Sequence, residues 1–168
     1  MSALLDDELA TRWVTPLADA LRARGWRIAA AESCTGGLIA ATCTALAGSS
    51  DWFERGFVTY SNQAKTDQLG VPAELIAAHG AVSEPVARAM AEGALARSPA
   101  DLALAVTGIA GPTGAVPGKP VGTVWLALAQ RGGAMRSELL QLDGDRSAVR
   151  AQTVAIALER MLAQIQAA

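Results

Sequence analysis

The sequence predicts an α/β fold: a three-layer α/β/α sandwich with a mixed, mostly parallel sheet. Short apolar segments alternate with amphipathic ones along most of the 168 residues. Strands that alternate with helices in this way form parallel sheets covered on both faces. Two further strand-like segments follow each other across a glycine-containing turn, which is typical of an antiparallel hairpin. We expect a single domain over residues 1–168, because a chain of this length can bury a substantial core.

The first part of the chain begins this alternation. Apolar residues at helical spacing predict an amphipathic helix over residues 4–24, which Gly25 ends. A short strand, WRIAAA, follows at 26–31, and a helix is expected over 35–47. The segment FERGFVTY at 53–60 is expected to form the second strand, because aromatic and β-branched residues favour strands.

Three helices are expected in the middle of the chain, because each has a residue suited to its start. They run from Ser61 or Asn62 to Gly70, from Pro72 to Gly80, and from Glu84 to Arg97 after Ser83.

The last part of the chain predicts the remaining strands. A buried-type strand at 101–106 leads into a glycine- and proline-rich loop, Thr107–Pro120. Strands at 121–129 and 135–142 would form a hairpin that turns at Arg131-Gly132-Gly133. The final helix would begin at Asp143 or Asp145 and run to about Gln166.

Composition excludes several classes of protein. A formal net charge of −2 gives no general attraction to nucleic acid. No signal peptide is visible, and no apolar segment is long enough to span a bilayer, so we expect a cytoplasmic protein without a membrane partner. Cys34 and Cys43 would point in different directions on one helix, and with a single His they cannot assemble a zinc site. We therefore expect reduced thiols, no metal and no cofactor.

The junction RIAAAESCTGG collects three potential nucleophiles where a strand is followed by a helix. Ligands of α/β sheets bind beyond the carboxyl ends of the strands. Ser33 could simply cap the helix, but Thr35 could do so instead. The pair Gly36-Gly37 permits close backbone approach, and free N–H groups at a helix start can hold an oxyanion. These features indicate Ser33 as a nucleophile.

A serine nucleophile needs a base, and Lys65 is the better candidate. It follows Tyr60 in YSNQAK, at another strand-to-helix junction, where it could instead be a solvated surface lysine. A lysine pKa of about 10.4 leaves only about one amine in 2,500 neutral at pH 7, so burial or a neighbouring positive charge would have to lower that pKa by about three units. Tyr60 could relay a proton or hold the pair in register. His79, at the end of a short helix, is the alternative base.

Two neighbours of Ser33 have competing interpretations. Cys34 is the rival nucleophile, although a cysteine just after a strand often points into the core and behaves as a small hydrophobe. Glu32 is either a carboxylate turned toward solvent or a polar member of the site, and the second reading is preferred here.

The loop Thr107–Pro120 is a candidate binding loop for a phosphorylated ligand. Its glycine spacing matches neither a dinucleotide fingerprint nor a P-loop. Facing a helix N-terminus, it could nevertheless help to bind phosphate. Arg146 and Arg150, one turn apart on the last helix, could add positive charge or could belong to a solvated helix face.

Four segments together resemble the CinA C-terminal domain family of nicotinamide-nucleotide amidases, also called NMN deamidases. They are AESCTGG at 31–37, FVTYSNQAKTDQLGV at 57–71, HGAVSEPVARAMAEGA at 79–94, and AVTGIAGPTG with KPVGTVW across 105–125. The similarity extends over nearly the whole chain. Residues 113–117 depart from the glycine-rich form that is usual in this family.

The resemblance implies hydrolysis of the carboxamide of nicotinamide mononucleotide to nicotinate mononucleotide and ammonia, a step of pyridine nucleotide salvage. It implies a metal-free serine amidase in which Ser33 is the nucleophile and Lys65 and Tyr60 assist. Together with the reasoning above, it predicts substrate contacts from Glu32, Cys34, Thr35, Gly36, Thr107, Gly108, Gly111 and Arg146.

Two alternatives remain open from the sequence. The chain could be a non-catalytic pyridine-nucleotide-binding module, or an amidase for another small amide such as free nicotinamide. A homo-oligomer is expected, because the first and last helices carry apolar positions beyond those needed to cover a sheet.

Overall fold

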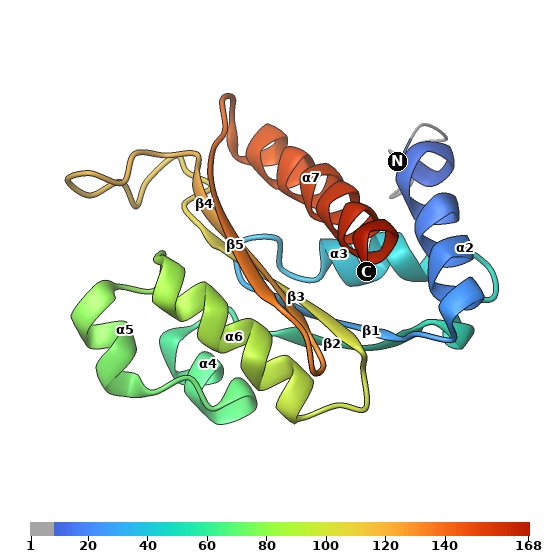
Figure 1. Ribbon diagram of the computed structural model, residues 1–168. Helices are drawn as coiled ribbons and strands as arrows, with labels where there is room; N and C mark the ends of the chain where they lie inside the picture. Colours follow the sequence, from blue (N-terminus) through green and yellow to red (C-terminus); the bar gives the residue numbers. More distant parts are fainter. Residues whose placement is uncertain (1–8) are drawn as a thin grey trace.

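A five-stranded sheet between two layers of helices forms the centre of the protein (Figure 1). The computed structural model describes residues 9–168. The spatial order of the strands is β2 (Phe53–Val58), β1 (Ile28–Glu32), β3 (Leu102–Gly108), β4 (Thr123–Gln130) and β5 (Met135–Gln141). β1 pairs in parallel with β2 and β3, whereas β4 is antiparallel to β3 and β5. Four of the five strands thus run in one direction, which confirms the predicted mixed, mostly parallel sheet.

The helices divide between the two faces of the sheet (Figure 1). One layer holds α2 (Thr15–Arg24), α3 (Leu38–Thr44) and α7 (Arg146–Ala167), and the other holds α4 (Asn62–Leu69), α5 (Ala73–His79) and α6 (Glu84–Ala96). A π-helical turn, η1 (Ala10–Val14), continues into α2, and a 3-10 turn, η2 (Ser49–Asp51), precedes β2. No helix within residues 9–168 combines the length and the apolar character needed to cross a bilayer.

Most predicted elements are present, with shorter bounds. The predicted helix over 4–24 is described only from residue 9, so its first residues lie outside the described part. The helix expected from residue 35 begins at Leu38, because Gly36 and Gly37 have φ values of 60° and 101° and form a turn instead. Thr59 and Tyr60, expected in the second strand, lie beyond its end at Val58.

The C-terminal predictions are confirmed in their main points. The β4–β5 hairpin turns at the expected glycines, and Gly133 N donates to Gln130 O. α7 begins after Asp145, whose side chain accepts a hydrogen bond from Ala148 N at 2.9 Å. Thr107 and Gly108, expected in a loop, are the last residues of β3.

The two faces of the sheet carry side chains of different size. On β3, Leu102, Leu104 and Val106 pack against the α2 and α7 layer, while Ala103 and Ala105 face α6. On β4, Leu126 and Leu128 likewise face the α2 and α7 layer while Ala127 and Ala129 face α6, whereas β1 has Ile28 on the first face and alanine on both. Alanine side chains project only a short distance from the sheet, so α6 packs closely there through its own small side chains.

The direction of the strands decides where the functional residues gather. β1, β2 and β3 are parallel, so their carboxyl ends meet at one edge of the sheet. Three segments leave that edge: the serine turn (Ser33–Gly37), residues 59–61 before α4, and the glycine loop (109–122). The glycine loop projects from the body of the protein, next to the start of α7 (Figure 1).

The close packing of α6 yields a stability prediction at Gly93. A Cβ atom there would collide with the carbonyl group of Leu69 at the end of α4. Helix propensity alone would make Gly93→Ala stabilising by up to about 1 kcal/mol. We expect the collision to reverse this sign and to cost about 1–3 kcal/mol of unfolding free energy, measured by urea denaturation.

The matched control is Glu92→Ala, an exposed position on the same helix, which should change stability by less than about 0.5 kcal/mol. An alanine variant at Gly93 as stable as the unmodified protein would show that α6 and α4 are not in this close contact.

Candidate active site

A cavity of about 210 Å³ lies where the carboxyl ends of the parallel strands meet. The residues that line it come from all three segments, from the stretch before α6, and from α7. They are Ser33, Cys34, Tyr60, Lys65, Ala81, Val82, Thr107, Gly108, Ala110 and Arg146.

The centre of the cavity is a contact between a serine and a lysine. Ser33 follows β1, and Lys65 lies in α4, yet Lys65 Nζ is 3.1 Å from Ser33 Oγ. The same nitrogen donates to the carbonyl oxygens of Thr59 at 2.8 Å and Tyr60 at 3.3 Å. The structure thus brings together the two residues that the sequence indicated as nucleophile and base.

The lysine is buried without a compensating negative charge. Lys65 is 1% exposed, and among residues 9–168 no carboxylate lies within ion-pair distance of its amine. Burial lowers the pKa of Lys65 below its usual value, and the neighbouring Cys34 opposes this shift. Part of the lysine population therefore becomes neutral at a lower pH than in water.

Glu32 has a different role from the expected substrate contact. It is 1% exposed, and its Oε2 accepts hydrogen bonds from Thr35 Oγ1 at 2.6 Å, Gly37 N at 3.1 Å and Ile39 N at 3.0 Å. Its Oε1 accepts from Ala40 N at 2.8 Å. The carboxylate thus satisfies the free N–H groups at the start of α3 and holds the serine turn onto β1.

Thr35 likewise does not reach the cavity with its side chain. It is fully buried, and its hydroxyl is used by Glu32. Gly36 is exposed on the serine turn, and its N–H donates to Ser33 O at 3.1 Å. Within residues 9–168, the N–H groups of Cys34 and Thr35 donate to no other residue, so they are the free backbone donors beside the nucleophile.

Cys34 lines the cavity but has the properties of a buried, unreactive thiol. It is 5% exposed, and burial raises its pKa to about 11. Burial also raises the pKa of Cys43. A thiolate is the nucleophilic form of cysteine, so a raised pKa makes Cys34 the weaker candidate.

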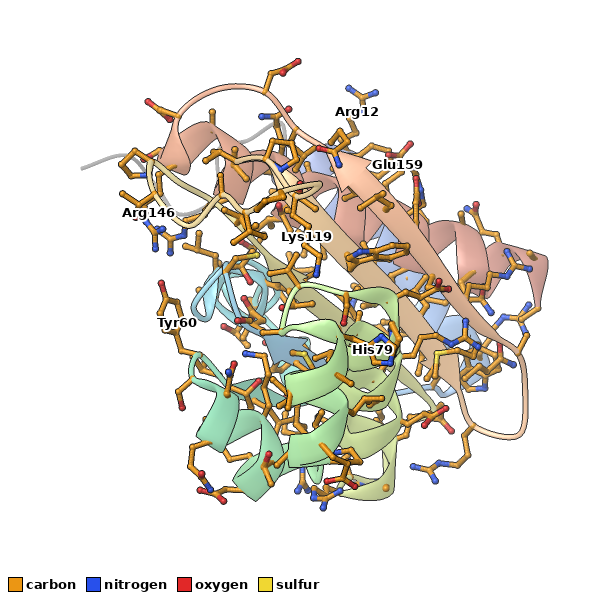
Figure 2. All side chains as sticks on the ribbon, turned by 90° about the vertical axis from the view of Figure 1, so that its left-hand side faces the viewer. Arg12, Tyr60, His79, Lys119, Arg146 and Glu159 are labelled. Atoms are coloured by element: carbon orange, nitrogen blue, oxygen red, sulfur yellow. The ribbon has the colours of Figure 1, made fainter. Side chains whose placement is uncertain are left out.

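Tyr60 and Arg146 form a pair at the rim of the cavity. Figure 2 shows them at one edge of the molecule, pointing toward each other from different elements. Arg146 Nη2 donates to the Tyr60 hydroxyl at 3.1 Å, and Arg146 Nη1 donates to Gly111 O at 3.1 Å. The Tyr60 side chain is 60% exposed and does not lie between Ser33 and Lys65, which are in direct contact.

Thr107 and Gly108, at the end of β3, line the cavity next to Ser33, whose N–H donates to Val106 O at 3.1 Å. Thr107 is 1% exposed, and its hydroxyl donates to Ala81 O at 2.9 Å, which fixes the stretch before α6. Gly108 lines the cavity, and Gly111 contributes its carbonyl to Arg146. His79 is exposed and is not part of the lining, and Figure 2 shows it away from Tyr60. Its carbonyl oxygen accepts a hydrogen bond from Lys119 Nζ at 3.0 Å.

Sequence reasoning missed the acceptors that hold the lysine. The amine contacts the backbone of Thr59 and Tyr60, and a backbone carbonyl leaves no signal in residue type. Sequence reasoning also missed Ala81 and Val82 as residues of the cavity wall, because small apolar residues before a helix cannot be distinguished from those of any other loop.

Comparison with known proteins yields consistent relatives. The profile of the family described as CinA C-terminal domain matches residues 11–165. The nicotinamide-nucleotide amidohydrolase PncC of Escherichia coli (strain K12) is 54% identical over 145 residues, which cover 86% of this chain and 88% of PncC. A putative competence-damage inducible protein of Symbiobacterium thermophilum is 58% identical over 146 residues. The chain spans about a third (34%) of that longer relative.

Solved structures agree with these sequences. A crystal structure of a competence-damaged protein (CinA) superfamily protein from Klebsiella pneumoniae superimposes with a TM-score of 0.89 and 42% identity, covering 92% of this chain and 96% of the other. A competence/damage inducible protein from Agrobacterium tumefaciens gives a TM-score of 0.87 and 48% identity, covering 97% and 98%.

The buried lysine predicts a pH-dependent effect on stability. In the unfolded chain, Lys65 regains its ordinary pKa near about 10.4, so the unfolded state binds more protons at pH values between the lowered pKa and that value. Stability of the unmodified protein therefore rises with pH in this range. Lys65→Met should unfold at a higher temperature at pH 7, and its advantage should shrink toward pH 10.

Thermal unfolding followed by circular dichroism at several pH values measures this difference. Lys119→Met, at a partly exposed loop position, controls for the loss of a lysine side chain elsewhere. A Lys65→Met advantage that does not change with pH would contradict a lowered pKa.

Proposed function

The chain belongs to the CinA C-terminal domain family, and on that premise we propose that it is an amidohydrolase acting on nicotinamide mononucleotide. Hydrolysis of the carboxamide would give nicotinate mononucleotide and ammonia. The observation that carries the proposal is the 3.1 Å contact between Ser33 Oγ and a buried lysine amine without a counter-ion. The name of the E. coli relative, at 54% identity, supports the substrate.

The hydrogen bonds of Lys65 suit a neutral amine. A neutral amine has two N–H donors and one lone pair, and the two carbonyl oxygens of Thr59 and Tyr60 accept both donors. In the structure Nζ donates to Ser33 Oγ at 3.1 Å; in the neutral amine the lone pair would instead be directed at Ser33 Oγ and could accept its proton. Lys65 thus acts as the general base, and the direct contact makes a relay through Tyr60 unnecessary.

The reaction follows from this geometry. Ser33 Oγ forms a bond to the amide carbon while its proton moves to Lys65, and the N–H groups of Cys34 and Thr35 stabilise the oxyanion. The carbon–nitrogen bond then breaks, and Lys65 returns the proton to the departing ammonia. Lys65 then deprotonates a water molecule, which attacks the resulting ester. This step releases the carboxylate, and the proton returns from Lys65 to restore the Ser33 hydroxyl.

The size of the cavity sets how the substrate would sit. Its volume of about 210 Å³ is below the roughly 300–1,000 Å³ of typical ligand pockets. It can therefore enclose the carboxamide and part of the ring, while the ribose and phosphate extend over the rim. There the guanidinium of Arg146 and the hydroxyl of Tyr60 offer a charged and a neutral partner for phosphate oxygens.

A non-catalytic nucleotide-binding module is the less favoured alternative. Binding alone gains nothing from a lysine buried against a serine, since burying an uncompensated amine costs free energy. An amidase for a different small amide would use the same serine and lysine. It would differ only in which part of its substrate, if any, contacts Arg146 and Tyr60 at the rim.

The direct test is ammonia release from nicotinamide mononucleotide by the purified protein, with nicotinate mononucleotide identified by mass spectrometry. Ser33→Ala should lower kcat by at least about 10⁴-fold, because the covalent step is lost. The control Ser50→Ala, at an exposed serine outside the cavity, should keep full activity.

Three outcomes would revise the proposal. Full activity of Ser33→Ala would remove the nucleophile. Tight binding of the mononucleotide without ammonia release would favour the binding module. A higher kcat/KM for free nicotinamide than for its mononucleotide would favour the other amidase, because the rim would then contribute no binding energy.

The base assignment predicts the pH profile of the same reaction. Only neutral Lys65 can accept the proton, so kcat should be constant at high pH and fall as pH drops through the lowered pKa of Lys65. Lys65→Arg should lower kcat by at least about 10³-fold at every pH, because a guanidinium stays protonated. An acid limb centred near the ordinary lysine value of about 10.4 would contradict a base activated by burial.

A further inference from the structure

The first turns of α7 contact all three segments that form the cavity. Arg146 donates to Gly111 O in the glycine loop and to the Tyr60 hydroxyl before α4. Arg150, one helical turn later, donates through Nη2 to Thr35 O at 3.1 Å in the serine turn. The two arginines of one helix thus connect segments that follow three different strands.

Arg150 contacts the serine turn at a different atom of Thr35 from the one that Glu32 contacts. Glu32 accepts from Thr35 Oγ1, while the Thr35 carbonyl accepts from Arg150 and from Leu38 N at 3.2 Å. The Arg150 guanidinium also lies against the turn, since a Cβ on Gly36 would be 3.6 Å from Nη2. The peptide groups that carry the free N–H donors of Cys34 and Thr35 directly precede this carbonyl.

The position of Arg150 costs free energy, and its hydrogen bond to Thr35 O is the contact that can offset this cost. Its Nε atom is buried and has no hydrogen-bond partner within residues 9–168. Leaving a buried donor unpaired is unfavourable, and more so for a charged group. Arg150 does not line the cavity, so substrate contact does not account for its position.

We propose that Arg150 is a positioning residue for the proposed amidohydrolase reaction: by holding Thr35 O, it keeps the N–H groups of Cys34 and Thr35 directed at the developing oxyanion. The proposal rests on the proposed function for its substrate but not for its chemistry. Loss of one oxyanion donor typically costs about 10²–10³-fold in kcat. A turn that is loosened rather than removed should cost about 10–100-fold.

The first experiment measures kcat and KM for nicotinamide mononucleotide in Arg150→Ala and Arg150→Lys. Arg150→Ala should lower kcat about 10–100-fold and change KM less than about 3-fold, because ground-state binding is not affected. The matched control is Arg160→Ala, on the same helix, whose side chain pairs with Glu138 at 2.7 Å outside this cavity. It should leave both constants unchanged.

Two readouts separate positioning from a purely electrostatic or structural role. If the charge of Arg150 acted on Lys65, its removal would raise the pKa of Lys65 and move the acid limb of the kcat profile to higher pH. Positioning leaves that midpoint in place and lowers only the plateau. Guanidinium chloride at about 10–50 mM should partly restore kcat in Arg150→Ala but not in Arg160→Ala.

A second experiment does not depend on the substrate. A fluorophosphonate probe labels Ser33 when Ser33 Oγ bonds to phosphorus, fluoride leaves with the P–F electron pair, and the serine proton moves to Lys65. Intact-mass measurement should show labelling about 10–100-fold slower in Arg150→Ala than in Arg160→Ala. If the unmodified protein is labelled but releases no ammonia from the mononucleotide, the proposed function fails while Arg150 is still tested.

Unchanged labelling and unchanged kcat in Arg150→Ala would overturn the proposal. A large rise in KM at constant kcat would overturn it as well, because Arg150 would then bind substrate. Circular dichroism checks folding; if Arg150→Ala is unfolded, Arg150→Met, which keeps an apolar stem but has no donor for Thr35 O, takes its place with the same expected effect.

Discussion

The burial of one lysine amine without a counter-ion is the constraint on which the rest of the site depends. Lys65 is held by two backbone carbonyls and faces Ser33, so its surroundings supply hydrogen-bond acceptors but no charge. Three oxygen atoms accept hydrogen bonds from the amine, but within residues 9–168 no carboxylate offsets the charge of an ammonium. Burial therefore lowers the pKa of Lys65 at a local cost in stability, and in the proposed reaction this makes the amine available as a base at lower pH.

Keeping that amine aligned requires rigid loops, and the structure achieves this with buried polar contacts. Glu32 replaces a side-chain cap at the start of α3 and fastens the serine turn to β1. Arg146 and Arg150 fasten the same region to α7. Every one of these contacts crosses between elements, so no single segment carries the geometry of the site by itself.

The packing of the sheet supports the same arrangement. The alanine face of β1, β3 and β4 lets α6 lie close, and the stretch before α6 forms part of the cavity wall. The bulkier face supports α7, whose first turns reach the serine turn and the glycine loop. The size of core side chains thus sets the position of the walls relative to the strand ends.

The sequence by itself determined the elements and the chemical types. Alternating patterns predicted the strands and helices. At the junctions after β1 and β2, the residue types, the glycines and the helix-capping residues indicated Ser33 and Lys65. The roles of Glu32, Thr35 and Tyr60 were decided only by the tertiary structure. A carboxylate that follows a strand looks the same whether it faces substrate or caps a helix, and a tyrosine beside a lysine looks the same in the site or at its rim. The hydrogen bonds of Glu32 join residues only 3 to 8 positions apart, but residue type alone does not show that the serine turn folds back onto this carboxylate. The place of Tyr60 depends on the strand order β2-β1-β3 and on α7, and contacts between residues 32 and 115 positions apart, such as Lys65–Ser33 and Arg150–Thr35, are not encoded in any local pattern.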